Sequence, residues 1–201
     1  QNKKNIAAII IEPARGNAVD KSYLLKLKKI ARKIDAVLIF DEITSGFRIN
    51  VGGIHLLDKI NPDIAVFAKS MSNGYAMSAV IGNSKVMESA KKTFISSTNW
   101  TEKVGPSAAI STIKKCIRKK VFSHNIQMGK LMKKIWTKLS KKYSLDIEIS
   151  GLDTLPSFSF KSKDNLVMQT FFTREMLKHK ILAFRQFRPS YSHNKRHLIL
   201  Y

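Results

Sequence analysis

The sequence predicts an α/β domain with a mostly parallel sheet, followed by a smaller α+β domain. In the first 82 residues, short apolar runs alternate with stretches of helical periodicity, the pattern of consecutive strand-helix-strand units. After residue 125 long helical stretches give way to a mixed pattern. We therefore expect domains at 1–125 and 126–201, and a chain of 201 residues that is 44% hydrophobic has enough apolar material for both.

The first half of the predicted sheet comes from two apolar runs. Residues 6–11 are continuously apolar, which predicts a strand buried on both faces. Residues 24–34 carry leucine, isoleucine and alanine at helical spacing, and residues 36–40 form the next strand. A short helix is expected over 54–60.

The later elements follow the same periodicity rules. We predict a buried strand at 64–67, a turn at 72–74 and a fourth strand at 78–82. A helical stretch at 106–142, a half-buried strand at 155–160 and a helix at 167–179 follow. Irregular or extended chain is expected from there to residue 201.

Composition excludes several classes of protein. The longest apolar run spans six residues, 6–11, whereas a membrane-spanning helix needs about 20. The single cysteine, Cys116, excludes an internal disulfide framework and a multi-cysteine metal site, and it fits a reducing compartment. We expect a cytoplasmic protein with no membrane partner and no metal ligands.

The net charge of +22 raises the question of a nucleic-acid partner. Basic residues cluster in two predicted helices, 107–120 and 126–142, but the second has the ordinary amphipathic pattern of an apolar stripe with a solvated basic face. Lysines are also spread along the whole chain. We therefore expect no nucleic-acid partner, and a basic nucleic-acid-binding module stays the alternative from another class.

The two ends of the chain indicate a piece of a longer protein. No methionine opens the sequence, an apolar run begins at Ile6, and residues 198–201 are apolar with no polar tail after them. Natural termini are usually polar and loosely held.

Two chemically capable residues follow neighbouring strands of the predicted sheet. Ligands of parallel sheets bind at the carboxyl edge, where Asp41 follows one strand and Lys69 follows another. An apolar strand before Lys69 and small residues after it predict a partly desolvated amine, which makes Lys69 a candidate Schiff-base former. Pyridoxal phosphate enzymes also need an acid beside the pyridine nitrogen, and Asp41 suits that position.

Three segments in this order resemble the class III pyridoxal-phosphate-dependent aminotransferases, and among them the glutamate-1-semialdehyde aminomutase-like branch. The segments are VLIFDEITSGFR at 37–48, PDIAVFAKSMSNG at 62–74 and ISSTNWTEKVGPSAA at 95–109. The resemblance implies a fold type I transferase, with 1–125 as part of the large cofactor-binding domain and 126–201 as a truncated small domain. It also implies a fragment that lacks the N-terminal part and the extreme C-terminus.

The same resemblance assigns roles to four residues. Lys69 would hold pyridoxal 5'-phosphate as a Schiff base and move protons, and Asp41 would pair with the pyridine nitrogen. Ile43 would pack on one face of the ring, and Thr98 would donate its hydroxyl to the cofactor phosphate, usually from the neighbouring subunit of a homodimer. As alternatives, Ile43 is a plain core residue and Thr98 caps the helix near Gly105.

Two departures from the family pattern affect function. The glycine-serine or glycine-threonine phosphate loop and the aromatic residue on the other ring face are not in this chain, so we expect weak cofactor binding and an inactive fragment. Residues 98–102 read TNWTE where many relatives have a glycine-rich turn, and Trp100 is expected to narrow or reshape the substrate entrance.

Two reactions are compatible with the resemblance. We favour an aminotransferase that moves an amino group between an amino acid or amine donor and a carbonyl acceptor, because residues 98–102 differ from the mutase form. The alternative is intramolecular amino transfer of the glutamate-1-semialdehyde 2,1-aminomutase type. The sequence does not identify the donor or the acceptor.

Overall fold

The computed structural model describes residues 5–201 and divides the chain into two compact units, Gln1–Lys119 and Lys120–Tyr201. Each unit has its own sheet and its own hydrophobic core. The predicted boundary after residue 125 lies within the first helix of the second unit, α5 (Val121–Lys142).

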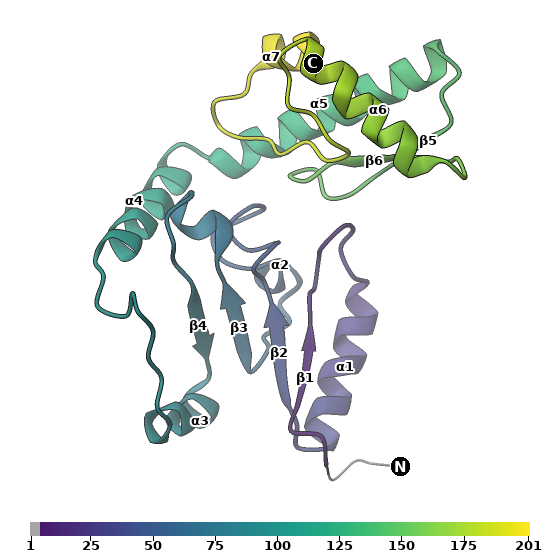
Figure 1. The fold of residues 1–201 in the computed structure, drawn as a ribbon. Coiled ribbons are helices and arrows are strands. Elements are labelled where there is room, and N and C mark those ends of the chain that lie inside the picture. Colours follow the sequence, from purple (N-terminus) through teal and green to yellow (C-terminus); the bar gives the residue numbers. More distant parts are fainter. Residues whose placement is uncertain (1–4) are drawn as a thin grey trace. The chain divides into compact units, whose positions relative to one another are not determined.

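The first unit is built on a four-stranded sheet in the order β1-β2-β3-β4 (Figure 1). Its strands are β1 (Ala8–Ile11), β2 (Val37–Asp41), β3 (Ile64–Phe67) and β4 (Ala79–Gly82). The first three strands run parallel and β4 runs antiparallel to β3. The mostly parallel sheet predicted from the sequence is confirmed.

One core cluster of this unit forms between the sheet and α1 (Lys21–Lys33). Leu24 and Ala31, seven residues apart on one face of the helix, are buried together with Leu38 and Phe40 of β2. The helix begins where the sequence supplies a cap, because Asp20 Oδ1 accepts hydrogen bonds from the N–H groups of the first turn.

The structure corrects the prediction of a first strand buried on both faces. Ile9 and Ile11 of β1 pack against the α1 cluster, whereas Ile10, on the other face, is 65% exposed. The reason is position: β1 is an edge strand of this sheet, and the described residues cover only the face that carries α1. A continuous apolar run does not show how many of its faces are covered.

Short helices and one long helix complete the first unit. They are α2 (His55–Asp58), η2 (Lys69–Ser72), α3 (Ser84–Met87), η3 (Glu88–Lys92) and α4 (Val104–Arg118). A further core cluster joins Ala65 and Phe67 of β3 to Met71 of η2 and Ala109 of α4. Packing against α4 thus holds η2, the segment that follows β3, against the core.

The second unit consists of α5, a two-stranded antiparallel sheet and two further helices. These elements are β5 (Ile147–Ser150), β6 (Ser157–Phe160), α6 (Asn165–Lys178) and α7 (Lys195–Leu200). Met132 and Trp136 of α5 meet Phe158 of β6 and Leu198 of α7 in its core. Within residues 5–201, no helix is both long enough and apolar enough to cross a membrane.

Three details of the second half differ from the sequence predictions. The second of the two predicted helices, 126–142, begins earlier, at Val121 of α5, directly after Lys120, whose φ of +49° lies in the left-handed region. Strand β5 has only four residues, and helix α7 begins at a capping box formed by Asn194 and His197. Elements this short carry too few periods to be identified by spacing alone.

Gly129 is expected to be required in α5. A Cβ atom there would lie 1.5 Å from the backbone oxygen of Asp153. Alanine normally stabilises a helix by about 1 kcal/mol relative to glycine, but overpacking costs roughly 1–3 kcal/mol and more when backbone must move. We expect Gly129→Ala to lower the free energy of unfolding by at least about 2 kcal/mol, measured by urea denaturation.

Gln127→Ala is the matched control, because Gln127 is exposed on the same helix. This variant should stay within about 0.5 kcal/mol of the wild-type protein. Equal stability of both variants would show that the close approach of α5 to Asp153 is not maintained in solution.

Candidate active site

The two predicted functional residues leave the sheet at the same edge. In the parallel pairing of β2 with β3, Asp41 lies opposite Val66, and the N–H of Glu42 donates to Val66 O at 2.9 Å. Lys69 follows three residues after Val66, as the first residue of η2. Asp41 and Lys69 therefore both lie at the carboxyl-end edge of the sheet.

Lys69 has an unusual backbone conformation for a residue that follows a strand. Its φ is +47°, in the left-handed region, where a non-glycine residue costs roughly 1–3 kcal/mol. The side-chain amine donates a hydrogen bond to Thr44 Oγ1 at 3.0 Å. Lys59 and Lys120 share this backbone conformation, so it does not by itself distinguish Lys69 from other lysines of the chain.

The predicted partial desolvation of Lys69 is wrong for the described chain. The residue is exposed, although Met71 later in η2 is buried. The turn predicted at residues 72–74 is present, since Asn73 and Gly74 both have positive φ at the end of η2.

Asp41 is half-buried at the end of β2. Its Oδ1 accepts a hydrogen bond from the N–H of Ile43 at 3.0 Å, which fixes the carboxylate relative to the turn that follows. The second carboxylate oxygen accepts no hydrogen bond from residues 5–201. Ile43 itself is half-buried, and neither of the two predicted roles for it, ring packing or plain core, is tested by this arrangement.

Glu42 is completely buried directly behind this edge, and the sequence analysis did not identify its role. Its Oε1 accepts from the N–H of His55 at 3.1 Å and lies 2.8 Å from His55 Nδ1. Its Oε2 accepts from Ser45 Oγ at 2.5 Å and from the N–H of Ile54 at 3.1 Å. Nothing in the spacing of residues 42, 45 and 55 marks them as partners, because the loop between them is irregular.

The ionised form of Glu42 is favoured despite its burial. Desolvation alone would raise the pKa of this carboxyl, but the hydrogen bonds from His55, Ser45 and Ile54 outweigh that effect and lower the pKa below its usual value. A carboxylate that accepts several hydrogen bonds is stable in its charged state without solvent.

Thr98 lies away from helices, on an exposed turn between η3 and α4. The alternative in which Thr98 caps a helix is wrong, since α4 begins at Val104 after Lys103 and has no side-chain cap. Its predicted contact with the phosphate group in a neighbouring subunit stays a prediction.

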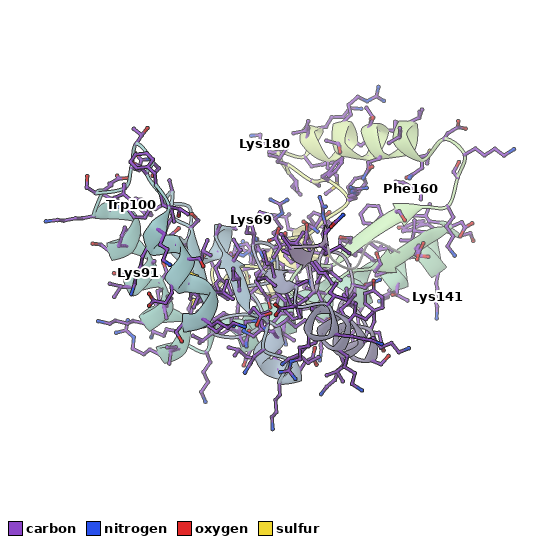
Figure 2. The ribbon with its side chains drawn as sticks, turned by 90° about the horizontal axis from the view of Figure 1, so that it is seen from below. Lys69, Lys91, Trp100, Lys141, Phe160 and Lys180 are labelled. Carbon is purple, nitrogen blue, oxygen red and sulfur yellow. The ribbon has the colours of Figure 1, made fainter. Side chains whose placement is uncertain are left out.

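Trp100 lines a pocket of about 520 Å³ in the first unit. The other lining residues come from the segment before β4, from the same loop and from α4: Ala76, Met77, Ser78, Ser97, Asn99, Glu102 and Pro106. Trp100 is 64% exposed, and Figure 2 shows it on a projecting loop, well apart from Lys69. Residues 5–201 contain no cluster of three or more metal-ligating side chains.

Comparison with protein-family models matches residues 1–185 to the aminotransferase class-III family. The match covers most of the 201 residues, so this chain belongs to the class-III aminotransferases. The resemblance inferred from the three sequence segments is confirmed.

Curated relatives include both reaction types of the family. The chain is 30% identical over 190 residues to 3-aminobutyryl-CoA aminotransferase of Cloacimonas acidaminovorans, covering 90% of this chain and 46% of the relative. It is 35% identical over 148 residues to glutamate-1-semialdehyde 2,1-aminomutase of Nitrosopumilus maritimus, covering 70% of this chain and 32% of the relative. The chain thus spans less than half the length of these two relatives.

Solved structures confirm the fold. The PLP internal aldimine form of the FumI protein of Sphingopyxis sp. MTA144 matches with a TM-score of 0.91 and 21% identity, covering 98% of this chain and 50% of that one. An omega-transaminase from Sphaerobacter thermophilus matches with a TM-score of 0.86 and 18% identity, covering 96% and 49% of the two chains. The predicted fold type I architecture, present here in part, is therefore correct.

Ser45→Ala tests the buried carboxylate through its pH dependence. Removing one hydrogen bond to a buried charge should lower the free energy of unfolding by about 1–3 kcal/mol at pH 7. The pKa of Glu42 is lowered in the folded state, so its contribution is present above about pH 4.5 and is lost as the pH falls through the folded-state value. The difference between variant and wild type should accordingly shrink in acid, as measured by urea denaturation from pH 7 to pH 3.

Ser84→Ala provides the control, because Ser84 is exposed and Asn83 supplies the cap of its helix. Its effect should be below about 0.5 kcal/mol at every pH. A Ser45→Ala effect that does not change with pH would mean that the hydroxyl does not support the ionised form of Glu42.

Proposed function

We propose that the protein containing this chain is a pyridoxal-phosphate-dependent aminotransferase that transfers an amino group between an amino acid or amine donor and a carbonyl acceptor. The observation that carries the proposal is the placement of Asp41 and Lys69 at one edge of a parallel sheet, in a member of the class-III aminotransferase family. The chain spans about half of its relatives, so the activity belongs to the whole protein.

The residues at this edge fit the cofactor. Pyridoxal phosphate supplies a ring that withdraws electrons from the carbon bearing the amino group. Its pyridine nitrogen needs an acidic partner, and Asp41 has one carboxylate oxygen without a hydrogen bond from residues 5–201. Its aldehyde needs a primary amine, and the amine of Lys69 is exposed and oriented by Thr44.

Each residue then has a defined task. Lys69 would bind the cofactor covalently through its amine and, when released from that bond, would accept and return a proton at the reacting carbon. Asp41 would keep the ring nitrogen protonated, and Ile43 would present an apolar side chain to one face of the ring. Thr98 would donate its hydroxyl to the phosphate group across the interface of a homodimer.

The division of labour between the two units follows the same proposal. Residues 1–125 would be part of the large cofactor-binding domain, and residues 126–201 would belong to the small domain. The phosphate loop predicted for the family would come from chain outside these 201 residues, so this segment alone should bind the cofactor weakly. The cytoplasm, inferred from the single cysteine Cys116, stays the proposed location.

Intramolecular amino transfer is the second candidate reaction. It is supported by the 35% identity to the aminomutase of Nitrosopumilus maritimus. The two reactions differ in whether the amino group leaves the molecule that carried it. The distinction can be tested by incubating a nitrogen-15-labelled amine donor with an unlabelled acceptor and following where the label appears.

The alternative of a nucleic-acid-binding module is not supported by the arrangement of charge. Basic side chains occur on helices of both units, including α1, α4, α5 and α6, rather than on one of them. Family membership points instead to small-molecule substrates.

Lys69→Ala tests the proposed covalent attachment in the full-length protein. The wild-type protein, incubated with pyridoxal phosphate and then reduced with borohydride, should carry the cofactor on the peptide that contains Lys69. The variant should lose this adduct and at least about 99% of its amino-transfer activity, because no other group replaces the amine. Peptide mass spectrometry identifies the modified lysine.

Lys85→Ala is the matched control, since Lys85 is an exposed lysine of the same unit. It should retain both the adduct and the activity. The lysine assignment is wrong if Lys69→Ala retains a stoichiometric adduct and normal turnover.

A further inference from the structure

We propose that Glu42 is a positioning residue, whose buried carboxylate fixes the loop of residues 43–54 and so holds Ile43 and Thr44 beside Asp41 and Lys69. The inference rests on the proposed function, since it concerns the geometry of the same site. Glu42 is fully buried, and its carboxylate pairs with Ser45, Ile54 and His55, not with the two functional residues.

The carboxylate joins the two ends of the loop. Glu42 follows β2 directly, and its side chain accepts hydrogen bonds from the N–H groups of Ile54 and His55, where α2 begins. His55 Nδ1 and Ser45 Oγ supply two more contacts. A single side chain therefore closes a loop of twelve residues.

Backbone contacts hold the loop in the same closed form. The N–H of Gly46 donates to Glu42 O at 2.7 Å, and the N–H of Phe47 donates to Gly52 O at 2.8 Å. Arg48 Nε donates to Thr44 O at 2.8 Å. The first of these bonds turns the loop back on Glu42, and the other two hold its interior.

The space around the carboxylate is too tight for a rearranged network. A Cβ atom at Gly53 would lie 2.4 Å from both Glu42 Oε1 and His55 Nδ1, and one at Gly46 would lie 2.6 Å from Phe67 Cδ1. The carboxylate is therefore closely packed, and a donor that loses this acceptor is left in a buried position.

A carboxylate suits this position better than an amide. Oε2 of Glu42 faces the N–H of Ile54, and Oε1 faces the N–H of His55, and both groups can only donate. Glutamine can present an oxygen to one of these groups, but its NH₂ must then face the other. Glu42→Gln keeps the size of the side chain and removes one specific acceptor.

The loop is connected to both functional residues through its first two positions. The N–H of Ile43 donates to Asp41 Oδ1 at 3.0 Å, and Thr44 Oγ1 accepts from Lys69 Nζ at 3.0 Å. Movement of the loop therefore changes the position of the acid and of the amine together.

The first test measures amide hydrogen exchange in the cofactor-free full-length protein. In Glu42→Gln, the amides of the loop and of Ile54 and His55 should exchange at least tenfold faster than in wild type, while those of α1 stay unchanged. Glu148→Gln, the same chemical change at an exposed position of β5, should alter neither. Unchanged exchange in the loop of Glu42→Gln overturns the inference.

The second test separates positioning from a purely structural role. Pyridoxal phosphate, added to the same variants, should bind at least tenfold more weakly to Glu42→Gln, with a shifted absorbance maximum, and normally to Glu148→Gln. Faster loop exchange with unchanged cofactor affinity and spectrum would make Glu42 structural only and overturn the inference.

One further variant and the wild-type protein keep the outcomes distinct. If Glu42→Gln does not fold, Ser45→Ala removes one contact of the same carboxylate and should produce both effects to a smaller degree; the inference fails if it produces neither. If wild type binds no pyridoxal phosphate at Lys69, the proposed function fails, and loop exchange in Glu42→Gln still decides whether Glu42 fixes the loop.

Discussion

The parallel pairing of β2 with β3 is the constraint on which the site depends. The two strands run in the same direction and pair Asp41 with Val66. Asp41, at the end of β2, and Lys69, just after β3, therefore lie at the same edge of the sheet. A shift of this register would separate them. The core residues Leu38 and Phe40, packed against α1, hold β2 in that register.

Behind this edge, a buried charge organises an irregular loop. Burial of Glu42 opposes its ionisation, but four hydrogen-bond donors compensate, and the pKa of the carboxyl is lowered on balance. The loop has no regular secondary structure, so its donors pair with carbonyl oxygens of the loop and with the carboxylate of Glu42. The same loop carries the residues that contact Asp41 and Lys69, which couples folding of the loop to geometry of the site.

Sequence reasoning identified the features that depend on local pattern. Alternating apolar runs predicted the sheet. The positions of Asp41 and Lys69 after two of its strands predicted the candidate site. It did not identify Glu42 with His55, because partners thirteen residues apart across an irregular loop leave no periodic signal. The exposure of Ile10 and Lys69 was also missed, because coverage is decided by distant parts of the chain rather than by neighbours in sequence.

A crystal structure of the full-length protein with pyridoxal phosphate tests the central claim most directly. The account predicts continuous electron density from Lys69 Nζ to the cofactor and a carboxylate oxygen of Asp41 within about 3 Å of the pyridine nitrogen. Density joining the cofactor to a different lysine, or a pyridine nitrogen with no contact to Asp41, would contradict it.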